Sequence, residues 1–259
     1  MISFYIITYN EATNIERCLK STIGLVDETI IVDSGSTDAT CEIARNYGAK
    51  VLLHAWEGYV AQRNFALSQC SHEWVLMLDA DEELSPELRL ELETLKPQLK
   101  VLLERGKVAF AMTRRVFYRG QWIMYGDWVP DYVTRLFRRD NAHYTGGLVH
   151  ESVKIDGKTS RLLSPIFHYT YCDRADHLAR IEKYSTLWAE SQTQQGRQVS
   201  AAAPLLRGGT RFIRSAFFKR GILQGALGWD IARLAAYEVW LKYHKLYALQ
   251  KKFPSSVKK

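Results

Sequence analysis

The motif Asp79-Ala80-Asp81 is the part of this chain in which residue types and spacing most clearly indicate chemistry. It directly follows the apolar run 74–78, which has the composition of a buried strand. Two carboxylates one residue apart, where a strand leaves the core, can meet a hard cation such as Mg²⁺ or Mn²⁺ together with a polar ligand. The alternative is a solvated turn, shared with Glu82 and Glu83, that starts a helix near Ser85.

Two other expected strands end in polar segments of the same kind. The strand expected at 2–7 is followed by Thr8-Tyr9-Asn10-Glu11, and the strand expected at 29–32 is followed by the polar segment 33–38. Parallel strands share a direction, so all three carboxyl ends should open on one edge of a sheet, where such sheets bind ligands. The sequence therefore predicts a polar site at that edge.

The first half of the chain alternates strands with helices, which predicts an α/β fold with a mostly parallel sheet. The expected elements are strands at 2–7, 29–32, 50–54 and 74–78, and helices from Asn14, at 39–47 and at 59–68. Extended segments follow from Val108, and helices are expected at 176–195, 210–220 and 228–252, with 196–209 as a connection. We expect a catalytic domain at 1–172 and a helical extension at 173–259.

Positive charge is concentrated in the last third of the chain. The whole chain carries +7, but residues 173–259 hold 16 Lys and Arg against 6 Asp and Glu, a net charge of +10. Nucleic acid and anionic membrane are both candidate partners for such a segment, although no nucleic-acid-binding signature accompanies it. Basic side chains mixed with Phe212, Ile213, Phe217 and Phe218 suit a helix on an anionic bilayer; packing on the catalytic domain is the alternative.

The remaining composition favours a cytoplasmic protein. The four cysteines are dispersed, which suits reduced thiols. No basic segment precedes the first apolar stretch as in a signal peptide, and we expect no membrane span. The first strand is not followed by G-x-G-x-x-G, and no G-x-x-x-x-G-K-[ST] occurs. Dinucleotide oxidoreductases, P-loop enzymes and nucleotidylyltransferases are therefore disfavoured.

Four ordered motifs resemble those of the family 2 glycosyltransferases. They are Ile6-Ile7-Thr8-Tyr9-Asn10-Glu11, Ile31-Val32-Asp33-Ser34-Gly35-Ser36-Thr37-Asp38, Gln62-Arg63-Asn64 and Leu78-Asp79-Ala80-Asp81. The resemblance implies the GT-A fold, which is Rossmann-like, an inverting reaction, a nucleotide-sugar donor and a divalent metal, Mg²⁺ or Mn²⁺. Two later segments, Arg135-Leu136-Phe137-Arg138-Arg139 and Gly146-Gly147-Leu148-Val149-His150-Glu151, resemble the subgroup that adds a sugar to the lipopolysaccharide inner core.

The resemblance also implies roles for residues of the donor site. Asp81 is expected to bind the metal, and Asp79 is expected to contact the ribose or the metal. Asp33 would accept hydrogen bonds from the base or ribose, with capping of the following helix as the alternative. Arg63 would contact the uracil or a phosphate, unless it is a solvated helix residue.

Thr8 and Glu11 are expected in the nucleotide-binding loop, although Glu11 also suits a surface turn. An inverting enzyme needs a base that deprotonates the acceptor hydroxyl. Glu151 is the first candidate and Asp131 the second, with Asp127 also considered. His150 is expected as a metal or diphosphate ligand, although a lone histidine is often structural.

These expectations define a specific enzyme. It would transfer a hexose, glucose from UDP-glucose, with inversion onto an inner-core heptose of a lipid-linked acceptor, as a peripheral protein on the inner face of the cell membrane. Alternatives are a polyprenol-linked or capsular glycan acceptor with the same chemistry, and a protein that only binds nucleotide sugars.

Overall fold

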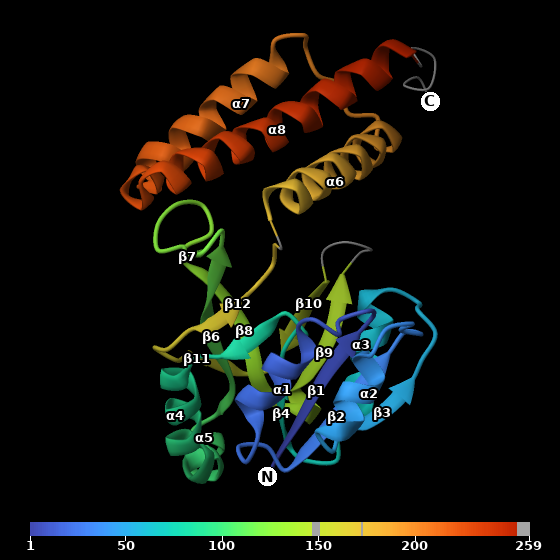
Figure 1. Cartoon of the computed structure of the whole chain (residues 1–259), viewed down its shortest axis with the longest axis vertical. Helices are drawn as coiled ribbons and strands as arrows, with labels where there is room; N and C mark the ends of the chain where they lie inside the picture. The colour runs from blue at the N-terminus through green and yellow to red at the C-terminus, as the bar shows by residue number, and fades with distance from the viewer. Residues whose placement is uncertain (147–150, 172, 253–259) are drawn as a thin grey trace. The chain divides into compact units, whose positions relative to one another are not determined.

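The computed structural model describes residues 1–146, 151–171 and 173–252, and it divides into two compact units (Figure 1). Unit 1 consists of Met1–Arg115 and Asp131–Tyr169, and unit 2 consists of Val116–Pro130 and Thr170–Lys259. The segment Val116–Pro130 thus belongs to the same compact unit as the helical region. The functional division at residue 172 stays a prediction.

Unit 1 is built on a mixed sheet with the strand order β3-β2-β1-β4-β8-β6-β12-β5. The first four strands in this order are parallel: β3 (Lys50–Leu53), β2 (Glu28–Asp33), β1 (Ile2–Thr8) and β4 (Trp74–Met77). From β4 onward the described pairings along this order are antiparallel, through β8 (Asp131–Arg138) to β6 (Lys107–Tyr118), and between β12 (Ile166–His168) and β5 (Glu82–Leu84). The expected α/β fold with a helical C-terminal region is confirmed.

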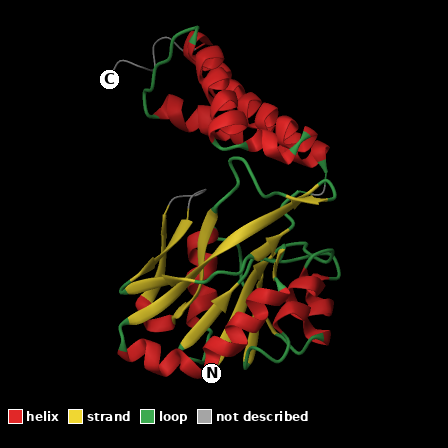
Figure 2. Ribbon diagram, turned by 90° about the vertical axis from the view of Figure 1, so that its left-hand side faces the viewer, coloured by secondary structure: helices red, strands yellow, loops and turns green. Residues whose placement is uncertain are grey.

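The other elements of unit 1 are helices and three further strands, two of which form a separate small sheet (Figure 2). The helices are α1 (Ile15–Thr22), α2 (Thr40–Asn46), α3 (Tyr59–Ser68), α4 (Pro86–Leu95), η1 (Lys96–Gln98) and α5 (Leu99–Glu104), with the short turn η2 (Arg139–Asn141). The remaining strands are β9 (Ala142–Gly146), which pairs with β10 (Glu151–Ile155), and β11 (Lys158–Arg161), which pairs with β6.

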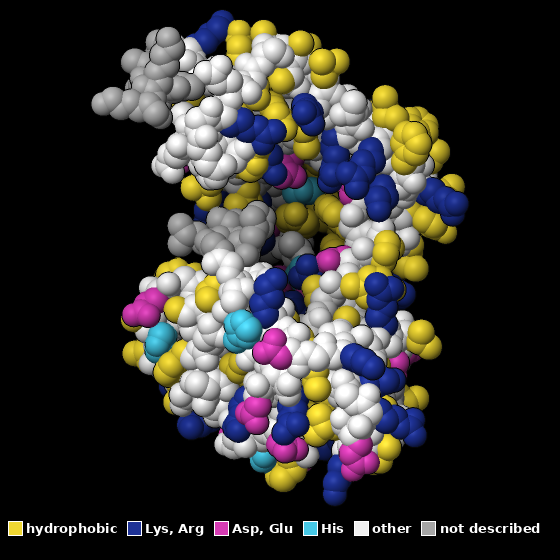
Figure 3. All heavy atoms as spheres, turned by 180° about the vertical axis from the view of Figure 1, so that it is seen from behind, with side chains coloured by type: hydrophobic (Ala, Val, Ile, Leu, Met, Phe, Trp, Pro, Cys, Tyr) yellow, Lys and Arg dark blue, Asp and Glu magenta, His cyan; other side chains and the backbone are white. Residues whose placement is uncertain are grey.

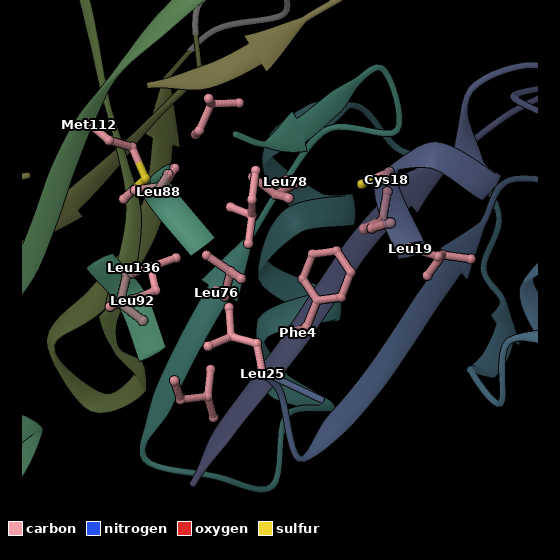
Figure 4. Packing of buried hydrophobic residues seen from close by; sticks show 14 of the residues in the cluster. Phe4, Cys18, Leu19, Leu25, Leu76, Leu78, Leu88, Leu92, Met112 and Leu136 are labelled. Carbon is pink, nitrogen blue, oxygen red and sulfur yellow. The ribbon is translucent and has the colours of Figure 1, made fainter. Parts of the chain in front are cut away.

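Alternate residues of the central strands pack on opposite faces of the sheet, as the period of a strand requires. Phe4 and Leu76 lie in one buried cluster with residues of α1 and α4 (Figure 4). Their neighbours Tyr5 and Met77 lie in a second cluster with residues of α3 and β9. Since β1 and β4 are buried on both faces, β4 is an unbroken apolar run and β1 is apolar from Phe4 to Ile7, and this is why the sequence identifies them.

Unit 2 is mainly helical, with α6 (Arg174–Gln194), α7 (Ala203–Ile213) and α8 (Ala226–Lys252). The π-helical segment η3 (Arg214–Phe218) and the 3₁₀ turn η4 (Gly221–Gln224) join α7 to α8, and β7 (Gln121–Trp122) pairs with the end of β6. No helix among the described residues is long and apolar enough to cross a membrane.

The connection expected at 196–209 is wrong in its second half, because α7 begins at Ala203. Gly208 and Gly209, which the sequence analysis took as part of a linker, both lie inside this helix. A Cβ atom on Gly208 would come within 3.1 Å of Cβ of Trp240, so this glycine allows α7 to lie close against α8. Pro204, within the first turn of α7, also suits a helix start.

Candidate active site

The three polar strand ends come together at the carboxyl edge of the parallel strands, as predicted. β1 lies between β2 and β4, and Thr8 at the end of β1 is the register partner of Asp33 at the end of β2. The Thr8 hydroxyl donates a hydrogen bond of 3.0 Å to Oδ2 of Asp33. Asp79 follows β4 on the other side of β1. The fold therefore assembles the predicted edge from three segments, of which the first and last are about 70 residues apart in the sequence.

Asp33 organises the loop that follows β2. Its Oδ1 accepts hydrogen bonds from the backbone amides of Gly35 and Ser36 at 2.9 and 2.8 Å, and its Oδ2 accepts from the hydroxyls of Ser36 and Thr8. Burial opposes ionisation, but these bonds outweigh it and lower the pKa of Asp33 below its usual value. A carboxylate offers about four acceptor positions, so a nucleotide that bonds to Asp33 has to displace one of these donors.

Asp79 is held by two arginines. Its Oδ1 lies 2.7 Å from Nη2 of Arg63 on α3, and its Oδ2 lies 2.7 Å from Nη2 of Arg135 on β8. Burial opposes the carboxylate charge, but the two guanidinium groups hold the pKa of Asp79 well below its usual value. Burial also opposes both cations, yet their carboxylate partners raise the pKa of Arg63 and Arg135. All three groups therefore stay charged across the ordinary pH range.

Arg135 also joins Asp79 to a completely buried acid. Its Nη2 lies 2.7 Å from Oε1 of Glu82, whose side chain is 0% exposed. Glu82 Oε2 accepts a hydrogen bond of 3.1 Å from the backbone amide of Asp79, which fixes the loop that carries the motif. The alternative reading of this segment as a solvated turn is wrong for Glu82, because it is a buried residue of β5.

The chain of charges continues to both candidate bases. At one end Arg114 lies 3.4 Å from Glu82 and forms a salt bridge with Asp131. Its Nε donates a hydrogen bond of 2.8 Å to Oδ2 of Asp131, and its Nη2 lies 2.6 Å from the same oxygen. At the other end Nη2 of Arg63 lies 3.4 Å from Oε1 of Glu151. We call this alternating series the edge network; its members are Glu151, Arg63, Asp79, Arg135, Glu82, Arg114 and Asp131.

Arg63 is a buried residue, so its alternative reading as a solvated helix residue is wrong. Its guanidinium carbon lies 5.6 Å from the centroid of the Tyr144 ring on β9. The Tyr144 hydroxyl in turn accepts a hydrogen bond of 2.8 Å from Tyr5. A guanidinium held on several sides is preorganised to meet a ligand without further loss of side-chain freedom.

Asp81 and His168 form a separate pair beside the edge network. Oδ2 of Asp81 lies 3.3 Å from Nε2 of His168 on β12, and the side chains are 24% and 12% exposed. Among the described residues, no group of three His, Cys, Asp or Glu side chains could hold a metal ion. Mg²⁺, however, is usually held by one or two carboxylates together with substrate phosphates and water, so Asp81 beside His168 fits such an ion.

Asp79 fits a metal ion less well than Asp81 does, because both of its oxygens already accept charged hydrogen bonds from arginine. Glu11 lies in the loop after β1, where its Oε2 accepts a hydrogen bond of 3.0 Å from the Asn14 side chain. Asp127 belongs to unit 2 and lies 3.2 Å from Nε of Arg211. His150 lies outside the described residues.

The sequence predicted no site role for Arg135, Glu82, Arg114 or His168. Arg135 appeared in the sequence only within the segment Arg135-Leu136-Phe137-Arg138-Arg139, which resembles the inner-core subgroup. These residues come from β5, β6, β8 and β12, on the part of the sheet beyond β4. No local pattern predicts the order of those strands.

Comparison with known proteins gives consistent results. The model of the family "Glycosyl transferase family 2" matches residues 3–152. An uncharacterized glycosyltransferase of Rickettsia prowazekii is 31% identical over 97% of this chain and 88% of its own length. The lipopolysaccharide core biosynthesis glycosyltransferase LpsC of Rhizobium meliloti is 29% identical over 95% of this chain and 92% of its own.

Two solved structures are also similar. S. aureus TarS 1–349 in complex with UDP-GlcNAc has a TM-score of 0.46 and 14% identity, over 98% of this chain and 91% of that chain. Glucosyl-3-phosphoglycerate synthase of Mycobacterium tuberculosis, in complex with Mn²⁺, UDP and glucosyl-3-phosphoglycerate, has a TM-score of 0.35 and 30% identity, over 46% and 44%. With more than half of its length matched by the family model and full-length relatives at 31% identity, the chain belongs to glycosyl transferase family 2.

Proposed function

We propose that this glycosyltransferase transfers glucose from UDP-glucose, with inversion, onto an inner-core heptose of lipopolysaccharide. The observation that carries the proposal is the division of roles within Asp79-Ala80-Asp81. Asp79 is locked between two arginines, while Asp81 lies one residue further on beside His168. A rigid, charged edge next to a carboxylate that can meet a cation suits a donor with a diphosphate.

Asp81, with His168 beside it, would hold a Mg²⁺ or Mn²⁺ ion at this edge. When bound, the ion would neutralise the negative charge that develops on the departing diphosphate, without proton transfer. Arg63 would contact the uracil or a phosphate, and the loops of Thr8, Glu11 and Asp33 would contact the nucleoside. Asp79 would contact the ribose through an oxygen that also accepts from arginine.

Glu151 is the proposed catalytic base. The acceptor hydroxyl oxygen bonds to the anomeric carbon as the bond from that carbon to the phosphate oxygen breaks, and the hydroxyl proton passes to the Glu151 carboxylate. Arg63, 3.4 Å away, would orient that carboxylate. Asp131 is the second candidate, although its Oδ2 already accepts a hydrogen bond from Nε of Arg114 and lies in a salt bridge with Nη2.

The acceptor class is supported by relatedness. LpsC, whose name assigns it to lipopolysaccharide core biosynthesis, is similar over nearly the whole of both chains. A lipid-linked acceptor implies work at the inner face of the cell membrane. A polyprenol-linked or capsular acceptor would use the same donor chemistry, so the acceptor has to be tested separately from the donor.

The decisive experiment measures hydrolysis and transfer with a panel of UDP-, GDP- and ADP-sugars, with Mg²⁺, with Mn²⁺ and with chelator. We expect UDP-glucose to be preferred and activity to require metal. The acceptor panel is lipopolysaccharide truncated at the inner-core heptose and a polyprenol-linked glycan. Turnover in chelator at the full rate, or full activity of Asp81→Ala, would overturn the metal-assisted mechanism. Transfer to the polyprenol-linked glycan alone would overturn the proposed acceptor.

A further inference from the structure

The segment that joins α7 to α8 in unit 2 has an inverted pattern of burial. Its small residues Ser215 and Ala216 are buried, whereas Phe217 and Phe218 are 52% and 80% exposed. Isolated exposed apolar residues are common, but adjacent exposed phenylalanines in a region of other exposed apolar residues indicate an interaction site. We call this region the α7–η4 surface, and its apolar members are Leu206, Ile213, Phe217, Phe218, Ile222 and Leu223.

Close backbone packing holds these side chains outward. A Cβ atom on Gly221 would come within 2.6 Å of the Ser215 carbonyl oxygen, and a Cβ atom on Gly228 would come within 1.8 Å of the Gly221 carbonyl oxygen. The interior of this turn therefore has room only for backbone and small side chains. The larger side chains point away from it, with the Phe217 ring 6.1 Å from that of Trp229.

The same segment is purely cationic. Residues 203–225 contain five Lys and Arg and no Asp or Glu. Arg211 is paired with Asp127 at 3.2 Å, but Arg214, Lys219 and Arg220 form no salt bridge with any described residue. Lysine and arginine side chains gather beside apolar side chains on unit 2 in the space-filling view (Figure 3). Exposed phenylalanines among unpaired cations are complementary to a surface that is both apolar and anionic.

We propose that the α7–η4 surface binds an anionic lipid bilayer. Phe217 and Phe218 enter the boundary between headgroups and acyl chains, and Arg214, Lys219 and Arg220 pair with lipid phosphates. A protein partner or a second copy of this chain would need an acidic, apolar surface, whereas the bilayer supplies both properties together. The inference rests on the proposed function in one respect: a lipid-linked acceptor would be presented at the same membrane.

The experiment is flotation of the full chain with vesicles. One set contains phosphatidylethanolamine and phosphatidylglycerol, and the other contains only phosphatidylcholine. We expect binding to the anionic set, weakened by salt, and little binding to the neutral set. The double variants Phe217→Ser/Phe218→Ser and Lys219→Glu/Arg220→Glu should each lower the bound fraction by at least about tenfold.

Two variants of unit 1 serve as matched controls, because they change exposed side chains of the same types. These are Leu163→Ser, at a side chain that is 92% exposed, and Lys100→Glu/Arg105→Glu. Both should bind vesicles like the wild type. Circular dichroism and donor hydrolysis by every variant show whether the fold is retained.

Vesicle binding by the α7–η4 variants equal to that of the wild type would overturn the proposal. The proposal would also be overturned if the wild type does not bind vesicles and instead forms a dimer that these variants dissociate. Failure of this proposal can be distinguished from failure of the proposed function. Transfer to detergent-dispersed acceptor without vesicle binding would remove the membrane surface and leave the enzyme, whereas vesicle binding without transfer would do the reverse.

Discussion

The edge network of unit 1 and the α7–η4 surface of unit 2 differ in whether their charged side chains are paired within the fold. In the edge network, Arg63 and Arg135 are buried, and each has a carboxylate oxygen at 2.7 Å. In the α7–η4 surface, Arg214 and Lys219 lie in a segment without a single acidic residue. The edge network pairs its charges within the fold, whereas the α7–η4 surface leaves its cations available to external anions.

The difference follows from the cost of removing charge from water. A buried ion needs a partner within the fold, because its desolvation costs several kcal/mol. The resulting network is fixed before any ligand arrives, as electrostatic catalysis requires. Exposed cations carry no such requirement, so they can be kept for an external anion. The predictions below test whether the charges of the edge network support catalysis and stability. They also test whether close backbone packing stabilises the region beside the α7–η4 surface.

The largest effect is expected from Glu151→Gln. Loss of a catalytic base should lower kcat by about 10²–10⁴-fold, while UDP-sugar binding measured by calorimetry stays close to that of the wild type. The matched variant is Asp131→Asn, at the other end of the edge network, which should have a smaller effect on kcat. If Asp131→Asn abolishes turnover while Glu151→Gln retains it, the assignment of the base has to be exchanged.

Next in size is the loss of stability in Arg135→Met. Removal of this guanidinium leaves Glu82 buried without its closest cation, and this should lower the free energy of unfolding by about 3–5 kcal/mol. The measurement is urea denaturation followed by tryptophan fluorescence. Arg138→Met is the control on the same strand, because Arg138 is paired with Glu73 at 3.6 Å near the surface. Such pairs contribute about 0–1 kcal/mol, so equal losses in the two variants would contradict the argument.

The sequence predicts the position of the edge network better than its membership. Thr8, Asp33 and Asp79 could be placed at one edge because they end apolar runs in a pattern of alternating strands and helices, which restricts the strands to a common direction. Arg135 could not be placed in this way. It reaches Asp79 because β8 pairs antiparallel with β4, with Leu136 opposite Leu76. That pairing joins segments about 60 residues apart and has no local signature.

In unit 2 the prediction of a linker at Gly208-Gly209 was wrong. Gly208-Gly209 favours a linker by intrinsic propensity, because glycine is a poor helix former. The structure continues α7 through both residues, and Gly208 packs against Trp240. The contact between Gly208 and Trp240 is possible only without a side chain at position 208, and it outweighs the low helix propensity of glycine. Trp240 lies 32 positions further along the sequence. The continuation of α7 through Gly208 and Gly209 could therefore not be predicted from the sequence, although Pro204 suits the start of the helix.

A third prediction concerns the pH dependence of the edge network. The folded pKa of Asp79 is lowered, so its contribution to stability is present above the unfolded pKa of about 3.9 and is lost as pH falls toward the folded pKa. The difference in unfolding free energy between wild type and Asp79→Asn should be constant above about pH 5. Below about pH 3.9 it should shrink by up to about 1.4 kcal/mol per pH unit.

Urea denaturation of both proteins over a series of pH values measures this difference, and groups other than Asp79 largely cancel in the subtraction. A difference that stays constant down to pH 2 would show that Asp79 stabilises the fold by shape and not by charge. The paired charges of the edge network would then not contribute to stability, and the contrast with the unpaired charges of the α7–η4 surface would fail.

The smallest effects are expected where the start of α8 packs against η4, because close backbone contacts hold this part of unit 2. In Gly228→Ala the new Cβ would lie 1.8 Å from the carbonyl oxygen of Gly221, so the backbone has to shift, at a cost of about 1–3 kcal/mol. Gly209→Ala is the matched control, since nothing lies within 4 Å of its Cβ position in α7. There the helix should gain about 0.5–1 kcal/mol. Opposite signs in urea denaturation, unchanged between low and high salt, would distinguish packing from electrostatics, because only the latter is screened.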